Sequence, residues 1–239
     1  MIRIIFKVII SIIFIISIIV AYLSIVGIET ARFNDQIRTQ IKKIDNDLDI
    51  ELKKINIVLD PFQLSINAKT IGTKLRNKEK FIEIENIKTQ LSIKAFLNNE
   101  FLITSMYISS KTLEIKNLIS FLRNFINKPE LYILERIVGQ GFLVADIKLK
   151  FDSKGKIKKN YEIKGSAKDI SLKIFDNYNI KETNFNFNIN DESFNFTKIK
   201  INFNNTEFIS DQIQVAKNQK KFFINGNFKN TISEITEKE

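Results

Sequence analysis

The sequence contains no cysteine, no histidine and no tryptophan, and it has only two prolines and seven glycines among 239 residues. The absence of cysteine excludes a disulfide framework and thiolate metal sites. Because histidine is absent as well, the common zinc sites, the serine or cysteine nucleophile systems that need histidine, and imidazole acid–base chemistry are also excluded. We therefore expect neither an enzyme nor a protein with a bound metal or cofactor.

The sequence also has no segment in which positive charge is concentrated. The chain has 37 Lys and Arg against 27 Asp and Glu, a net charge of +10, but these residues are scattered along it. No basic cluster with interleaved aromatic residues occurs, which argues against nucleic acid as a partner. The excess charge could attract anionic lipid headgroups or simply solvate the surface, and composition leaves both readings open.

All charge is absent from residues 8–28, a predominantly apolar run rich in Ile and long enough to cross a bilayer as one helix. Arg3 and Lys7 precede this transmembrane segment, and Glu29 is the first charged residue after it. The bias of positive charge toward the cytoplasm therefore predicts that residues 1–7 are cytoplasmic and that the remainder lies across the membrane.

A cleaved signal peptide is the alternative interpretation. Its apolar region is normally about 7 to 15 residues long and ends in a small-x-small cleavage site. The run here is longer, and residues 18–23, Ile-Ile-Val-Ala-Tyr-Leu, contain no Ala-x-Ala pattern. We therefore expect a retained single-pass anchor.

Residues 29–47 have the periodicity of an amphipathic helix. Phe33, Ile37, Ile41 and Ile44 recur every three or four positions between polar residues. The apolar stripe of this helix is expected to cover the bilayer surface or the open end of the following fold, or to pack into an ordinary core.

From residue 48 the apolar period changes to two, and residues 48–116 are predicted to form a first unit of antiparallel strands. Residues 117–139 interrupt them with a helical insertion. Apolar residues recur at helical spacing from Leu118, and Pro129 suits the first turn of a second short helix. A strand at residues 131–138 is the alternative for the second part of the insertion.

The alternation is clearest in residues 140–230, the predicted second unit. In the segment 184–190 every second residue is asparagine and the residues between are Phe or Ile. A change of phase after Phe196 predicts a β-bulge, and Gly165 predicts another bulge or bend. The tail, residues 231–239, is expected to be a solvated end or the start of further structure.

Each of the ten to twelve predicted strands is apolar on one face, which raises the question of what covers that face. A sandwich would pack two such faces together without a cavity. A sheet curled into an open, taco-like groove would leave the face available to acyl chains. The anchor, the long alternating segments and the lack of convergent polar residues favour the groove.

The predicted fold is therefore mainly β with an N-terminal transmembrane helix, an antiparallel meander curled into an open β-groove, and a short helical insertion. The predicted groove lining comprises the inward-facing apolar residues Leu143, Ile147, Leu149, Phe151, Ile163, Phe185, Phe187, Ile189, Ile201, Phe203, Val215 and Ile224.

Four segments carry a resemblance to a known family: residues 27–37, the Asp-Pro segment 57–66, the alternating run 141–155 that ends in Asp-Ser-Lys-Gly, and residues 224–230. Together they resemble the N-terminal part of AsmA-like envelope proteins, the superfamily that includes TamB and YhdP. The resemblance implies a repeating β-groove, anchored in the inner membrane, through which phospholipid tails pass toward the outer membrane. It implies no catalytic residues.

On this basis we expect a single-pass protein of a bacterial inner membrane, with a cytoplasmic N-terminus and a periplasmic β domain that binds lipid acyl chains and contributes to phospholipid transport to, or assembly of, the outer membrane. The expected partners are phospholipid, the inner membrane and another envelope protein docking on the edge of the terminal strand. The alternatives are a single-span lipopolysaccharide-export adaptor with a β-jellyroll, and an envelope scaffold without a ligand.

Overall fold

A computed structural model describes residues 2–31, 34–42, 45–94, 102–124, 126–153, 156–175, 178–218 and 221–230. The helices are α1 (Ile2–Ile25), α2 (Asn34–Lys42), α4 (Ile115–Arg123) and α5 (Pro129–Ile137). The strands are β1 (Ile28–Thr30), β2 (Leu48–Glu51), β3 (Ile55–Asp60), β4 (Ser65–Asn77), β5 (Lys80–Ser92), β6 (Ile103–Ser110), β7 (Leu113–Glu114), β8 (Val138–Lys150), β9 (Glu162–Phe175), β10 (Tyr178–Ile189), β11 (Ser193–Phe203), β12 (Thr206–Asn218), β13 (Lys221–Gly226) and β14 (Lys229–Asn230).

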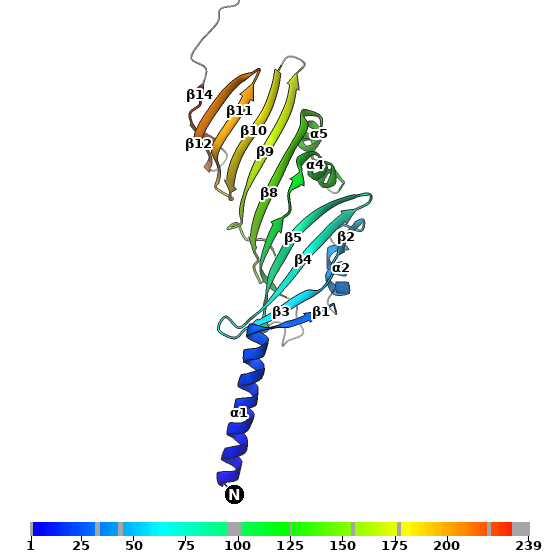
Figure 1. Cartoon of the computed structure of the whole chain (residues 1–239), viewed down its shortest axis with the longest axis vertical. Helices are drawn as coiled ribbons and strands as arrows, with labels where there is room; N and C mark the ends of the chain where they lie inside the picture. The colour runs from blue at the N-terminus through cyan, green and yellow to red at the C-terminus, as the bar shows by residue number, and fades with distance from the viewer. Residues whose placement is uncertain are drawn as a thin grey trace, which may run out of the picture.

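Helix α1 projects from one end of the molecule as a single rod (Figure 1). Its 24 residues give a length of about 36 Å at 1.5 Å per residue, enough to cross a hydrocarbon core of about 30 Å. The helix ends at Ile25, three residues before the predicted end of the transmembrane segment. Gly27 has a positive φ of 72°, and Ile28 then pairs with Ile57 in the sheet, which is why the helix stops there.

The predicted amphipathic helix at residues 29–47 is wrong at its beginning, because residues 28–30 form strand β1 against β3. Helix α2 covers the middle of that range, and the side chain of Asn34 in its first turn donates hydrogen bonds to backbone carbonyls just before β3. Ile37 and Ile41 are half-buried, while Phe33 and Ile44 of the predicted stripe lie outside the described residues.

The strands form one open antiparallel sheet. Its order is β1-β3-β4-β5-β6-β8-β9-β10-β11-β12-β13, with β2 beside β4, β7 beside β8 and β14 beside β12. From β3 onward, successive long strands are neighbours in the sheet, and the predicted meander is confirmed. β6 pairs directly with β8, and the predicted units at 48–116 and 140–230 are therefore two halves of one sheet. Because every described strand belongs to this sheet, the sandwich alternative is not formed within the described part of the chain.

The helical insertion folds back onto the sheet beside β5 and β8 (Figure 1). At one end of α4, Ile115 lies against Gly141 and Ile170, and at the other end the side chain of Asn124 donates a hydrogen bond of 3.4 Å to the carbonyl of Asn77 in β4. Helix α4 therefore crosses the sheet from β8 to β4.

Helix α5 packs against α4, and the alternative of a strand at residues 131–138 is wrong. Arg123 at the end of α4 forms an ion pair with Glu135, and its guanidinium lies 3.9 Å from the ring centroid of Tyr132. A cation held over an aromatic ring and paired with a carboxylate gives the two short helices a fixed relation to each other.

The bulge predicted after Phe196 is confirmed: Lys198 has a positive φ of 52°, and the register between β10 and β11 shifts beside it. Asp169 in β9 and Glu182 in β10 adopt the same conformation, so bulges occur in three adjacent strands. The bulge predicted at Gly165 is wrong, because the register runs through Gly165 without interruption.

Candidate functional site

The registers of ten successive strand pairs place one residue from each of eleven strands in a single line across the sheet. We call this line the central row. It consists of Thr30, Ile55, Thr70, Ile87, Ile108, Ile147, Ile163, Ile189, Phe194, Val215 and Ile224. Residues directly opposite each other on antiparallel strands project from the same face, so all eleven side chains share one face. All but the two threonines are apolar.

The rows on either side of the central row are apolar too. One contains Leu149 opposite Met106. The other contains Phe187 opposite Phe196, and the ring of Phe185 makes edge-to-face contacts with both, at centroid distances of 6.3 and 5.6 Å. Edge-to-face packing is the arrangement that aromatic quadrupoles favour. We call the surface formed by these rows the apolar face.

Within the described residues the apolar face is covered over part of its area, and Ile55 and Thr70 of the central row are 1% and 7% exposed. Under α4 and α5, Ile84, Val138 and Ile170 are at most 8% exposed. Along the central row from Ile87 onward the side chains are half-buried, shielded by one another rather than by a second layer, and Ile224 in β13 is 75% exposed. A face of this kind, spanning several strands, is unusual for a protein that meets water on all sides.

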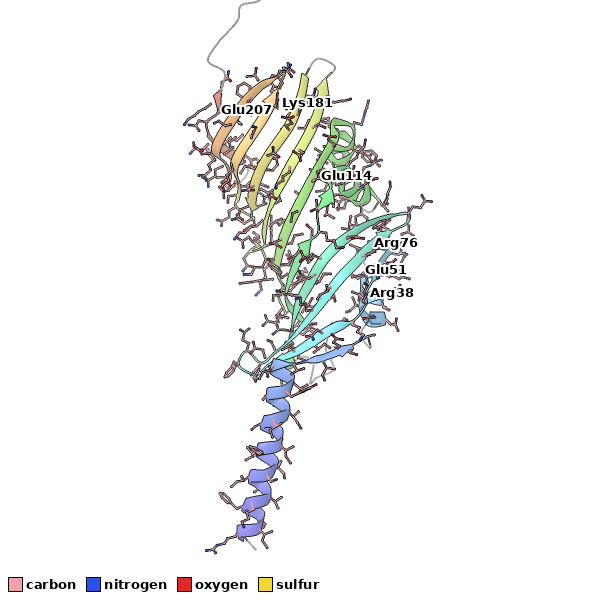
Figure 2. The ribbon with its side chains drawn as sticks, in the orientation of Figure 1. Arg38, Glu51, Arg76, Glu114, Lys181 and Glu207 are labelled. Atoms are coloured by element: carbon pink, nitrogen blue, oxygen red, sulfur yellow. The ribbon has the colours of Figure 1, made fainter. Side chains whose placement is uncertain are left out.

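The opposite face is mostly polar, although Phe142, Val144 and Phe223 are exposed on it. Alternation places Asp146, Lys164, Asn188, Asn195 and Gln214 side by side in one row. Figure 2 shows charged residues of this kind in both halves of the molecule, with Lys181 and Glu207 on the later strands and Arg76 close to Glu51 on the earlier ones. One face of each strand therefore suits water and the other excludes it.

Ion pairs across neighbouring strands organise the polar face. The carboxylate of Glu83 accepts from Lys111 at 2.7 Å and contacts Lys74 at 3.3 Å. These two ammonium groups, Lys111 first, lower the pKa of Glu83 below its ordinary value of 4.5. Within β9, Lys164 lowers the pKa of Glu162, and across β11 and β12, Glu207 raises the pKa of Lys200.

We expect acid to remove the contribution of Glu83. Because its folded-state pKa is lowered, the interaction stabilises the sheet above the ordinary pKa of 4.5 and is lost as the pH falls through the folded-state value. The variant Glu83→Gln should therefore melt slightly below the wild type near neutral pH and together with it in strong acid. The effect should be small because the pair is exposed. Thermal melts at both pH values, with Glu85→Gln as the control, check this, and a gap that persists in acid would contradict it.

All the predicted groove residues that lie in strands project from the apolar face. Five of them, Ile147, Ile163, Ile189, Val215 and Ile224, belong to the central row. Leu149 and Phe187 lie in the rows directly beside it, Leu143 and Phe185 lie one row further out, and Ile201 and Phe203 lie in β11 beyond the bulge at Lys198. Phe151 follows the end of β8 and forms a bridge with Ile157.

The predicted lining omitted half of the central row. Phe194 belongs to it, and so do Ile55, Ile87 and Ile108 in the first half of the sheet. The same two-residue alternation that singled out the later strands is present around these residues, so the signal was available. Alternation alone does not show that β6 pairs with β8, and this pairing joins the two halves of the sheet.

Comparisons with known proteins found no match. No protein-family model, no curated protein and no solved structure matches this chain. The fold and the site define a class in general terms only: a single open antiparallel sheet with one polar and one apolar face, joined to an N-terminal helix long and apolar enough to cross a membrane. Membership of the AsmA-like family stays a prediction.

Proposed function

We propose that this chain is a membrane-anchored lipid-binding protein whose sheet forms an open groove that shelters acyl chains. In this proposal α1 holds the protein in a bacterial inner membrane, and the sheet lies in the periplasm. Its work is to carry phospholipid between the inner membrane and the outer membrane, as the resemblance to AsmA-like proteins implies. No chemistry on the lipid is required.

The central row is the observation that supports this proposal. Ten strand spacings of about 4.8 Å make it roughly 48 Å long, and apolar side chains occupy every strand from β5 to β13. Each acyl methylene that leaves water for such a surface gains up to about 0.8 kcal/mol when it is fully buried. From Ile87 in β5 to Ile224 in β13 the row offers this gain at successive positions, so a chain can shift along this part without crossing a polar gap.

Two alternatives are less well supported. An export adaptor with a jellyroll needs two packed sheets, and the described strands form one. A scaffold without a ligand would be expected to cover its apolar face with its own chain, whereas in the described residues the central row is half-buried from β5 to β12 and Ile224 in β13 is 75% exposed. The scaffold differs from our proposal in one measurable property, which is whether lipid occupies the face.

The proposal also includes a docking edge at the far end of the sheet. All six residues of β13 are exposed, among them Phe222, Phe223 and Ile224. Strand β13 pairs with β12 and is the last strand in the order of the sheet, so it forms the outer edge. A strand from another envelope protein could pair there and extend the central row.

Native mass spectrometry of the protein, extracted from bacterial membranes in mild detergent, tests the proposed function. We expect mass increments that match one or more phospholipids and that survive removal of the detergent. A folded protein that carries no lipid at any protein concentration would support the scaffold alternative and contradict ours.

A further inference from the structure

The most exposed large apolar side chain outside α1 lies in the turn between β3 and β4. Phe62 is 96% exposed and Leu64 is 67% exposed. They stand with Pro61 and Gln63 in a four-residue turn that projects from the sheet. An aromatic and an aliphatic side chain at the tip of a turn expose a large apolar area, which indicates a contact with something other than water.

The turn is held in a definite shape. The Oδ1 atom of Asp60 accepts hydrogen bonds from the backbone N–H groups of Phe62, at 3.1 Å, and Gln63, at 3.0 Å. The N–H of Ile93 in the neighbouring segment donates to the carbonyl of Leu64 at 3.2 Å. Leu64 has a positive φ of 48°, a conformation that a leucine adopts only when its surroundings impose it. The two apolar side chains are therefore presented by a fixed backbone.

The turn lies at the end of the sheet from which α1 emerges. Gly27, directly after α1, packs against the backbone of Ile57 and the side chain of Val58 in β3, the strand that leads into the turn. In Figure 1 the turn stands at the same height along the long axis as the end of α1. Since α1 is about 36 Å long and the hydrocarbon core about 30 Å, this height corresponds to the headgroup region of a bilayer that α1 crosses. Tyr22, 56% exposed near the end of α1, is typical of that region.

We propose that the turn inserts Phe62 and Leu64 into the surface of the bilayer that α1 spans, as a second point of membrane contact. Phenylalanine and leucine are the side chains that interfacial segments bury at the boundary between headgroups and acyl chains. Two contacts fix the orientation of the sheet on the membrane, which one helix alone leaves free. The insertion depends on α1 crossing the bilayer and does not depend on lipid binding to the sheet.

The position of the turn also indicates which part of the apolar face lies nearest to the membrane. Leu59 and Ile66 flank the turn and pair with each other, and Leu91 and Ile103 continue their row on the apolar face. With the tip of the turn in the bilayer surface, this row begins beside the headgroup region. This consequence, unlike the insertion itself, rests on the proposed function.

The absence of tryptophan allows a direct test with the full-length protein in phospholipid nanodiscs. The variant Phe62→Trp places a single tryptophan at the tip of the turn, where the exposed site leaves room for it. The variant Phe81→Trp is the matched control, because Phe81 is 51% exposed and lies in β5 opposite Arg76, near the far end of β4, about 40 Å away along a strand of 13 residues. Each variant is measured in nanodiscs of ordinary and of brominated phosphatidylcholine.

We expect the tryptophan at position 62 to emit at shorter wavelength than the one at position 81 and to lose several-fold more intensity in brominated lipid. Equal emission and equal quenching at the two positions would overturn the proposal. A blue-shifted tryptophan at position 62 that brominated lipid does not quench would also overturn it, because a protein would then cover the turn. Failure of the proposed function would instead leave this quenching intact and remove lipid from the apolar face.

Discussion

The variant Ile147→Asp is expected to lose most of the lipid that co-purifies with the wild type. Ile147 lies in β8, in the middle of the sheet, and in the central row it stands between Ile108 and Ile163. A carboxylate there would have to leave water whenever an acyl chain covered it, at a cost of several kcal/mol. Because each 1.4 kcal/mol changes an affinity tenfold, we expect at least a tenfold drop in lipid occupancy by native mass spectrometry.

Lys148→Asp is the matched control for this variant. Lys148 is the next residue of the same strand, is exposed, and projects from the polar face beside Glu162. This control introduces the same side chain and should leave lipid occupancy within about twofold of the wild type. If both variants lose lipid equally, the loss reflects damage to the sheet. If neither loses lipid while both stay folded, acyl chains do not lie on the central row.

Replacing Gly165 with alanine is expected to cause the largest loss of stability. A Cβ atom at this position would lie 2.1 Å from the carbonyl oxygen of Val144 and 2.5 Å from the Cζ atom of Phe187. The phenyl ring can move, but the carbonyl belongs to the backbone of β8 and cannot move without disturbing the strand pairing. Overpacking of this kind typically costs about 1 to 3 kcal/mol, and we expect Gly165→Ala to fall at the upper end, near 3 kcal/mol.

Gly72→Ala separates this steric effect from a simple loss of glycine. Gly72 has a positive φ of 65° with no atom within 4 Å of the added Cβ, so its replacement should cost only the strain of the left-handed conformation, about 1 kcal/mol. Denaturant unfolding of the two variants in the same detergent compares them. If Gly165→Ala proves no more destabilising than Gly72→Ala, the close approach of Phe187 and Val144 to Gly165 is not tight.

These glycines illustrate how far the fold could be predicted. The alternation of apolar and polar residues reports the face of each strand, and it correctly predicted a mainly β chain, a meander and the bulge after Phe196. It does not report what lies opposite a residue on the next strand. Position 165 requires glycine because Phe187 of β10 packs over it. This cause is non-local, and no pattern around Gly165 contains it.

The same limit applies to the candidate site. Its later half was predicted because residues 184–190 alternate strictly, but the central row depends on the registers of ten strand pairs, and each register is set by turns and bulges. The pairing of β6 with β8 spans the whole helical insertion. Strand β1 was missed for a similar reason, since three residues after a long helix have no periodicity of their own and become a strand only through pairing with β3.

Site-specific photo-cross-linking tests the central claim most directly. A benzophenone amino acid replaces either Phe194 or Ile224 of the central row, or the next residue in each strand, Asn195 or Asn225, which projects from the polar face. Cells expressing each variant are labelled with radioactive phosphate and irradiated, and the purified protein is examined for bound label. Our account predicts phospholipid adducts at Phe194 and Ile224 and few or none at Asn195 and Asn225. Equal labelling of both faces, or no labelling of the central row in folded protein, would contradict it.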